Sequence, residues 1–267
     1  MNCYYCCIWL ILVLPGYPLG ILAQTPADTT GMQQSNSSAD DPSQFITRIE
    51  FFNELAHYPN QEYLNQTTFR TIVKLGKRFT TRLDIPYIYN SFTSPEGYKQ
   101  HGLSDISFRL LGFKLIPSRK SALTISIEIG LNTAASKLVG TGKNLIIPVL
   151  SYTRNLVKKG NFVSVLLQQV NSFSGDESRE NISYTKIQGF YIRTLSKKMW
   201  TVIAPVCYID YIHGGASMTL EGRIVYAAAP RSNFWVQAGV GLFGDFKLRY
   251  QWTVQIAYRY FLFRKMN

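Results

Sequence analysis

Apolar and polar side chains alternate one by one over segments of about ten residues along most of this chain. In the segment 121–133 the odd positions from Leu123 to Leu131 are Leu or Ile, and the positions between them are Thr, Ser, Glu and Gly. Successive side chains of a β-strand point to opposite faces, so each such segment is a strand with one apolar and one polar face. No helical spacing of comparable length competes with this pattern, which predicts an all-β fold.

Twelve segments show the strand pattern, and the links between them alternate in length. The expected strands are 44–56, 66–77, 81–91, 104–115, 121–133, 144–156, 162–172, 183–194, 199–211, 216–228, 232–243 and 249–263. Long links (57–65, 92–103, 134–143 and 173–182) alternate with short ones (78–80, 116–120, 157–161 and 195–198). Short turns at one rim and long loops at the other are typical of outer-membrane barrels. We therefore expect a closed antiparallel up-and-down transmembrane β-barrel of about 12 strands, its short turns and both ends periplasmic.

Three further features favour a barrel in lipid over a soluble β-sandwich, in which the same alternation would occur. Strands of about ten residues match the length that crosses hydrocarbon at a tilt. Only 16% of the residues are charged, against about 25% in an ordinary soluble domain. Aromatic residues lie near the ends of the apolar faces, as an interfacial girdle requires: Tyr87, Tyr89, Trp200, Tyr226, Phe234, Trp252, Tyr258 and Tyr260. A secreted sandwich or a lipocalin-like barrel is the alternative.

The N-terminal region predicts export. Residues 8–23 are apolar, are interrupted by Pro and Gly, and end on Ala23 before a polar stretch, which is typical of a secretory signal peptide over 1–23. The segment before this apolar core has no Lys or Arg, unlike most signals, and a buried strand or an anchoring helix is the alternative. Residues 24–43 are polar and aperiodic and predict a flexible arm, followed by the outer-membrane barrel over 44–267.

If the apolar faces contact lipid, the polar faces line the interior of the barrel. We therefore expect charged side chains to line the lumen at Arg48, Glu50, Arg70, Lys74, Arg82, Asp84, Arg109, Glu128, Glu221, Arg223 and Arg259. Arginines outnumber acids in this set, so an open lumen would favour anionic or polar solutes. Alternatively, Arg and Glu on neighbouring strands pair into a ladder that fills a narrow barrel and blocks flow.

The chain has a formal net charge of +12, and many basic residues lie in the expected short links: Arg78, Arg119, Lys120, Lys158, Lys159, Lys197, Lys198, Arg231, Arg264 and Lys265. Contact with anionic lipid head groups explains these basic residues at the expected periplasmic rim best. Attraction of anions or of an acidic periplasmic partner is the alternative. We expect no nucleic-acid partner, because the charges are scattered over turns rather than clustered.

The sequence shows no catalytic or cofactor-binding pattern. The three histidines, His57, His101 and His213, are isolated and lack ligand spacing, so we expect no metal site and no cofactor. The segment 140–144 (GTGKN) is a poor match to a phosphate-binding loop. Only the proximity of His213 to Ser217 would support a barrel hydrolase, so we expect that the protein is not an enzyme.

Three stretches resemble outer-membrane barrels of the meta-pathway phenol-degradation family. They are 102–109 (GLSDISFR), similar to a strand opening of that family, 127–155, similar to its long central hairpin, and 252–263 (WTVQIAYRYFLF), similar to a closing strand presented to the barrel assembly machinery. Two departures are Asn132–Ala135 in place of the family's Pro-Thr-Gly and the extension 264–267 past the aromatic end. The resemblance implies a transporter-like channel without catalytic residues.

These observations together predict a monomeric outer-membrane barrel whose partners are lipid, the barrel assembly machinery and a small solute. The main hypothesis is a passive channel for small, aromatic or anionic solutes. A structural or interaction barrel with a filled lumen, whose outer loops bind a partner, is the first alternative. A secreted all-β binding protein is the second.

Overall fold

A computed structural model describes residues 40–59, 63–91, 99–117, 120–136, 138–157, 160–244 and 250–262. The predicted signal peptide therefore lies outside the described residues. The strands are β1 (Arg48–His57), β2 (Tyr63–Leu75), β3 (Phe79–Ser91), β4 (Lys99–Leu103), β5 (Ser107–Pro117), β6 (Ser121–Gly130), β7 (Lys143–Asn155), β8 (Phe162–Gly175), β9 (Ser183–Thr194), β10 (Met199–Asp210), β11 (Ala216–Ala229), β12 (Ser232–Phe243) and β13 (Trp252–Phe261). No helix among the described residues is long and apolar enough to span a membrane.

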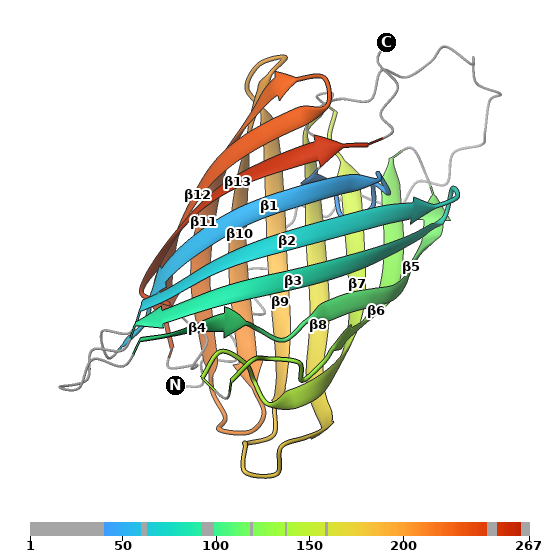
Figure 1. Ribbon diagram of the computed structural model, residues 1–267. Coiled ribbons are helices and arrows are strands. Elements are labelled where there is room, and N and C mark those ends of the chain that lie inside the picture. The colour runs from blue at the N-terminus through green and yellow to red at the C-terminus, as the bar shows by residue number, and fades with distance from the viewer. Residues whose placement is uncertain are drawn as a thin grey trace.

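The strands form one closed antiparallel barrel (Figure 1). Apart from β4 and β5, consecutive strands pair with each other, and β1 also pairs with β13 along its full length, from Arg48 opposite Phe261 to His57 opposite Trp252. The short β4 and the longer β5 share one position beside β3, because β4 pairs with Tyr87–Ser91 and β5 pairs with Phe79–Asp84. The wall is therefore 12 strands around, which confirms the predicted fold class.

The short strand β4 was not expected, since the sequence predicts a loop over 92–103. Its five residues, KQHGL, show no alternation of apolar and polar side chains, so the pattern that reveals the other strands is absent. Pairing with the end of β3 makes this segment a strand, and such pairing cannot be read from local sequence.

The two rims of the barrel differ in the length of their links. At one rim, called here the short-link rim, the links are residues 76–78, 118–120, 156–161, 195–198 and 230–231. β1 begins and β13 ends at this rim. The links at the other rim, the long-loop rim, include 131–142 and 176–182. Of the basic residues expected in short links, Arg78, Lys120, Lys197, Lys198 and Arg231 lie in them.

Large apolar side chains cover the outer face of the barrel. Phe51 is 49% exposed, Ile127 47% and Ile256 58%. Their neighbours in sequence on the same strands, Glu50, Glu128 and Gln255, are buried. Since a closed barrel leaves no unpaired strand edge, this apolar outer face and polar inner face are the arrangement that a barrel in lipid requires.

One residue of the expected aromatic girdle faces inward instead. Trp200 is 1% exposed, whereas Tyr87, Phe234 and Trp252 are exposed on the outer face as predicted. Tyr250, which is not one of the expected girdle residues, is also buried, at 5% exposed. In β10 the outer face begins with Met199, so Trp200 turns inward. Tyr250 precedes β13, and its hydroxyl donates a hydrogen bond to Glu221 at 2.9 Å.

An apolar cluster fills part of the interior near the short-link rim. It consists of inward side chains from β8 to β12: Phe162, Ile192, Trp200, Val202, Val225, Ala227 and Trp235. Burial of this area stabilises the wall by the hydrophobic effect. The inner face is therefore apolar along one arc of this rim, and the charged residues described below lie beside that arc.

Candidate functional site: the charged inner wall

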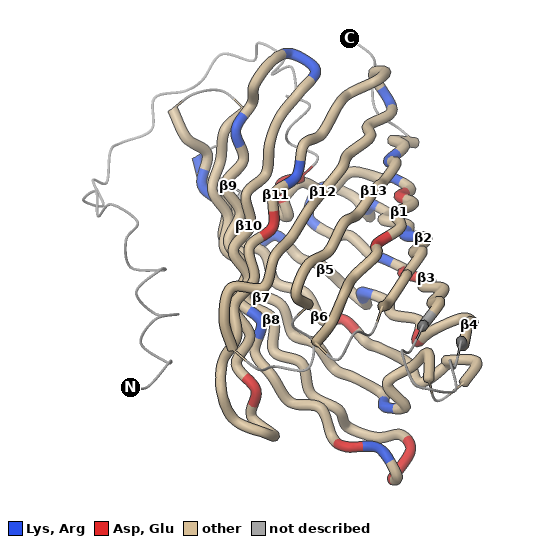
Figure 2. The backbone as a smooth tube through the Cα atoms, turned by 90° about the vertical axis from the view of Figure 1, so that its left-hand side faces the viewer, with Lys and Arg blue, Asp and Glu red and all other residues tan. Residues whose placement is uncertain are grey.

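Four adjacent strands place charged side chains of alternating sign in one row across the inner wall. The strand register sets Glu50 opposite Arg259 on one side and opposite Arg70 on the other, and Arg70 opposite Asp84. Figure 2 marks the positions of Lys and Arg and of Asp and Glu along β1, β2 and β3. Side chains directly opposite each other in an antiparallel sheet are close enough to pair, so the row is a consequence of register.

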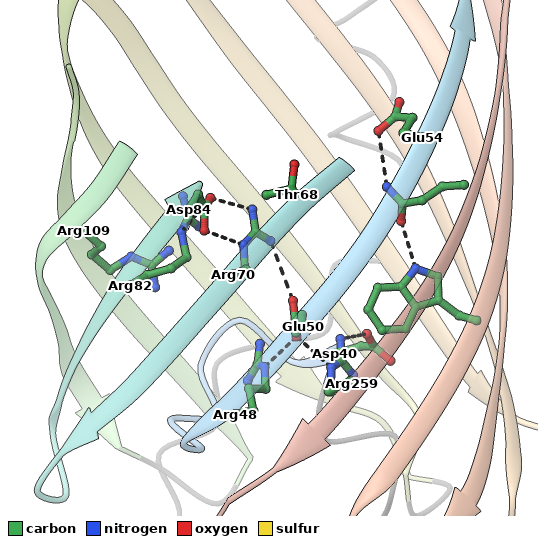
Figure 3. Close-up of polar contacts among 12 residues, drawn as sticks. Asp40, Arg48, Glu50, Glu54, Thr68, Arg70, Arg82, Asp84, Arg109 and Arg259 are labelled. Carbon is green, nitrogen blue, oxygen red and sulfur yellow. Dashed lines mark hydrogen bonds and ion pairs between the residues drawn. The ribbon is translucent and has the colours of Figure 1, made fainter. Parts of the chain in front are cut away.

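The carboxylate of Glu50 is the central acceptor of this row (Figure 3). Its Oε1 lies 2.7 Å from Nε of Arg48 and 2.7 Å from Nε of Arg259, and its Oε2 lies 3.9 Å from Nη1 of Arg70. Arg70 also binds Asp84 in a bidentate pair, with distances of 2.8 Å and 2.7 Å. Such charge-assisted pairs are among the stronger hydrogen bonds in proteins.

The row continues through β3, β5 and β6. Arg82 lies 3.3 Å from Asp84 and donates to Oε2 of Glu128 at 2.7 Å. Arg109 donates to Oε1 of the same Glu128 from Nη2 at 2.7 Å and from Nε at 3.1 Å. Glu128 thus neutralises two arginines on neighbouring strands, and its side chain is 3% exposed. The pairing of Arg and Glu between neighbouring strands, expected as one alternative, is present in this wall.

At the other end, the row is completed by a residue that precedes the first strand. Asp40 accepts hydrogen bonds from Arg259 at 3.1 Å, from Arg223 at 3.2 Å and from Nε1 of Trp200. Its side chain is 4% exposed. The sequence predicts a flexible arm over 24–43, but its last residues from Asp40 to Ser43 are packed inside the wall, and Asp41 binds Thr153 at 3.0 Å.

A second polar group extends from Arg223 toward the long-loop rim. Arg223 donates to Gln237 at 2.8 Å, and Gln237 donates to Glu221 at 3.1 Å. Glu221 also accepts a hydrogen bond from Tyr250. The inner wall therefore holds a continuous series of hydrogen-bonded and ion-paired polar side chains from β5 around to β11.

The structure places ten of the eleven predicted lumen residues in these groups. They lie on the inner wall with the partners given above: Arg48, Glu50, Arg70, Arg82, Asp84, Arg109, Glu128, Glu221, Arg223 and Arg259. Lys74 differs, because it lies one residue from the end of β2 and is exposed at the short-link rim. Two further residues of the site, Asp40 and Trp200, were not expected there. Asp40 lies in an aperiodic segment, and Trp200 was assigned to the opposite face.

At the long-loop rim, His213 joins two links. Its Nδ1 lies 2.9 Å from Asp210 and its Nε2 lies 3.2 Å from Glu180. The hydrogen bonds from Asp210 and Glu180 raise the pKa of His213 above its usual value. Both ring nitrogens thus face carboxylates, and Ser217 Oγ has no hydrogen-bond partner among the described residues. This geometry does not pair His213 with Ser217, as a hydrolase would require.

Within the described ranges, no group of three or more His, Cys, Asp or Glu is arranged to hold a metal. The weak phosphate-loop match at 140–144 has a different role. Thr141 donates from both its backbone nitrogen and its hydroxyl to Asp105, at 2.6 Å and 2.7 Å. Asp105 also accepts from the backbone nitrogens of Thr133 and Ala134. These contacts join the loop 131–142 to the segment between β4 and β5.

Comparison with known proteins supports the fold. No family model matches this chain, and no curated protein matches its sequence. Among solved structures, the COG4313 outer membrane channel from Pseudomonas putida F1 is similar with a TM-score of 0.64 and 12% identity, over 82% of this chain and 96% of that one. The NanC porin is similar with a TM-score of 0.58 and 6% identity, over 81% and 100%. The KdgM porin, in complex with disordered oligogalacturonate, has a TM-score of 0.53 and 11% identity, over 81% and 99%. At these identities the comparison shows a shared barrel fold.

Proposed function

We propose that this protein is a bacterial outer-membrane barrel that acts as a passive channel for small anionic solutes. The observation that carries the proposal is the contrast between the two faces of the wall. Exposed apolar side chains cover the outside, and the ion-paired row inside contains six arginines against four carboxylates. An excess of fixed positive charge in a confined, low-dielectric passage concentrates anions over cations.

The structural neighbours support the same proposal. All three are named as channels or porins, and one is recorded with an oligogalacturonate. Their fold is shared over about four fifths of this chain. Location in the outer membrane, export by a signal peptide over 1–23, a monomeric state and the absence of catalysis are parts of this proposal. Membership of the meta-pathway phenol-degradation family is a finer proposal, supported by the stretch 102–109, which here runs from the end of β4 into β5.

The test is electrical. Protein refolded in detergent is first checked for heat-modifiable gel mobility, which reports a closed barrel, and is then inserted into planar bilayers. We expect single-channel currents and, across a KCl gradient, a reversal potential of the sign that chloride selectivity gives. A folded barrel that never conducts, or one that prefers potassium, would contradict the proposal.

One observation favours a second function, a structural or interaction barrel with a filled interior. The apolar cluster and the segment from Asp40 to Phe45 occupy space inside the short-link rim. If these groups close the passage permanently, the same bilayer experiment gives folded protein without current. Liposome swelling with neutral sugars separates the two functions independently, because only an open passage admits them.

A further inference from the structure

Side chains from three separate strands converge on the carboxylate of Asp40. Trp200 comes from β10, Arg223 from β11 and Arg259 from β13, and all three donate hydrogen bonds to the one carboxylate. Two guanidinium groups and an indole N–H that converge on a carboxylate are the donor set expected of a carboxylate receptor. Asp40 itself belongs to none of these strands and reaches the site from the chain before β1.

The residues around Asp40 carry hydrogen-bond donors and acceptors that Asp40 does not bind. Arg259 Nη1 is buried and has no hydrogen-bond partner within the described part of the chain. Asn233, which lies directly opposite Arg259 in the strand register, is 0% exposed, and neither atom of its amide has a partner among the described residues. Buried polar groups in proteins nearly always have a hydrogen-bond partner, so an unpaired one needs an explanation. This surplus indicates a ligand with more polar atoms, or a different approach, than the Asp40 side chain.

An aromatic surface lies next to these donors. The guanidinium of Arg259 lies over the ring of Trp235 at 4.8 Å and that of Arg223 lies over the same ring at 5.2 Å. Trp235 and Trp200 both belong to the apolar cluster described above. A ligand with a carboxylate at one end and a compact apolar body at the other would find a partner for each part.

We infer that Arg223, Arg259 and Trp200 form a binding site for a small apolar-bodied carboxylate solute, and that Asp40 is an internal ligand which occupies this site until the solute displaces it. The inference rests on the proposed function, because it names the solute class of that channel. Apart from the contacts of Asp40 itself, the segment from Asp40 to Phe45 is joined to the wall by the hydrogen bond from Thr153 to Asp41, and Asp41, Ser43 and Phe45 are buried. A tethered carboxylate acts at a high effective concentration, so it weakens the apparent affinity for any free competitor.

The test measures binding of benzoate to the full-length barrel in detergent, by isothermal titration calorimetry and by tryptophan fluorescence. Binding in detergent does not depend on conduction, so this result and the bilayer result can fail separately. We compare the wild type with Asp40→Ala, which removes the internal ligand. Asp105→Ala is the matched control, since it removes the same charge near the other rim. Benzyl alcohol is the neutral control ligand.

We expect benzoate to bind Asp40→Ala about tenfold more tightly than it binds the wild type, as follows from removal of a charge-assisted intramolecular competitor. Asp105→Ala should match the wild type, and benzyl alcohol should bind all three proteins equally weakly. Adding Arg223→Met to Asp40→Ala should abolish the gain. Equal benzoate affinity in wild type and Asp40→Ala, or a gain that survives Arg223→Met, would overturn the inference even if the barrel conducts.

Discussion

The central carboxylate of the inner row offers a sharp test of how the wall is held together. Glu50→Gln keeps the size of the side chain and removes its charge. Three arginines lie within 3.9 Å of this carboxylate, two of them at 2.7 Å, and the Glu50 side chain is only 4% exposed. The substitution leaves Arg48 without its carboxylate partner and leaves Arg259 with Asp40 alone.

Breaking a buried ion pair by removal of one partner costs about 3–5 kcal/mol, because the remaining charge stays buried. The free energy of unfolding should therefore fall by about 3 kcal/mol, which is roughly a 150-fold change in the unfolding equilibrium. With a urea dependence of about 1–3 kcal/mol per molar, the unfolding midpoint should move down by about 1–3 M.

The assay is urea unfolding of the refolded barrel in detergent or lipid, followed by tryptophan fluorescence and by heat-modifiable mobility. Glu180→Gln is the matched control, since its pair with His213 lies at the long-loop rim with side chains 61% and 42% exposed. It should unfold with the wild type. Adding Arg48→Gln to Glu50→Gln should restore part of the loss, because it removes one uncompensated charge. If Glu50→Gln and Glu180→Gln unfold at the same urea concentration, the ion pairs of the inner row do not stabilise the barrel.

Three further predictions concern the passage, the outer face and the loops. Arg109→Ala and Arg223→Ala should each change single-channel conductance and lower the preference for chloride; unchanged single-channel records would remove that residue from the ion pathway. Ile125→Arg, on the outer face near the middle of β6, should lower the free energy of unfolding by about 2–4 kcal/mol in lipid, and a silent substitution would mean that this face does not contact acyl chains. The imidazole of His213 should titrate by NMR with a pKa above its ordinary value, and in Asp210→Asn this pKa should return toward the ordinary value. The contacts of His213 with Asp210 and Glu180 are complete at a pH below the ordinary pKa and are lost as the pH rises through the raised pKa. An unshifted pKa in the wild type would contradict the geometry.

The period-two pattern was sufficient to predict the barrel and most of its charged wall. In β6, for example, Ile125 and Ile127 face outward while Thr124 and Glu128 face inward, as their order in the sequence requires. Because successive side chains of a strand point to opposite faces, the inward charges could be named one by one. The residue with which each inward charge pairs depends on the register between neighbouring strands, and the sequence does not predict that register.

The errors occur where alternation fails. Trp200 is aromatic and lies near the end of an expected strand, so it was placed in the outer girdle, although it is buried inside. Asp40 lies in a polar segment without any periodicity, and its role depends on a contact with Arg259, 219 positions away in sequence. Contacts of this kind depend on closure of the barrel, so no local pattern reveals them.

The central claim is that the outer face of this barrel contacts acyl chains. Its most direct test uses the native tryptophans in vesicles of brominated phosphatidylcholine, whose bromine atoms quench fluorescence on contact. Variants that retain only Trp252, only Trp200 or only Trp235, with the other tryptophans changed to Phe, are compared after refolding. Trp252 is 38% exposed on the outer face, whereas Trp200 and Trp235 are 1% and 5% exposed. We expect strong quenching of Trp252 and little quenching of Trp200 and Trp235. Equal quenching of all three, or none of Trp252, would contradict contact of the outer face with acyl chains.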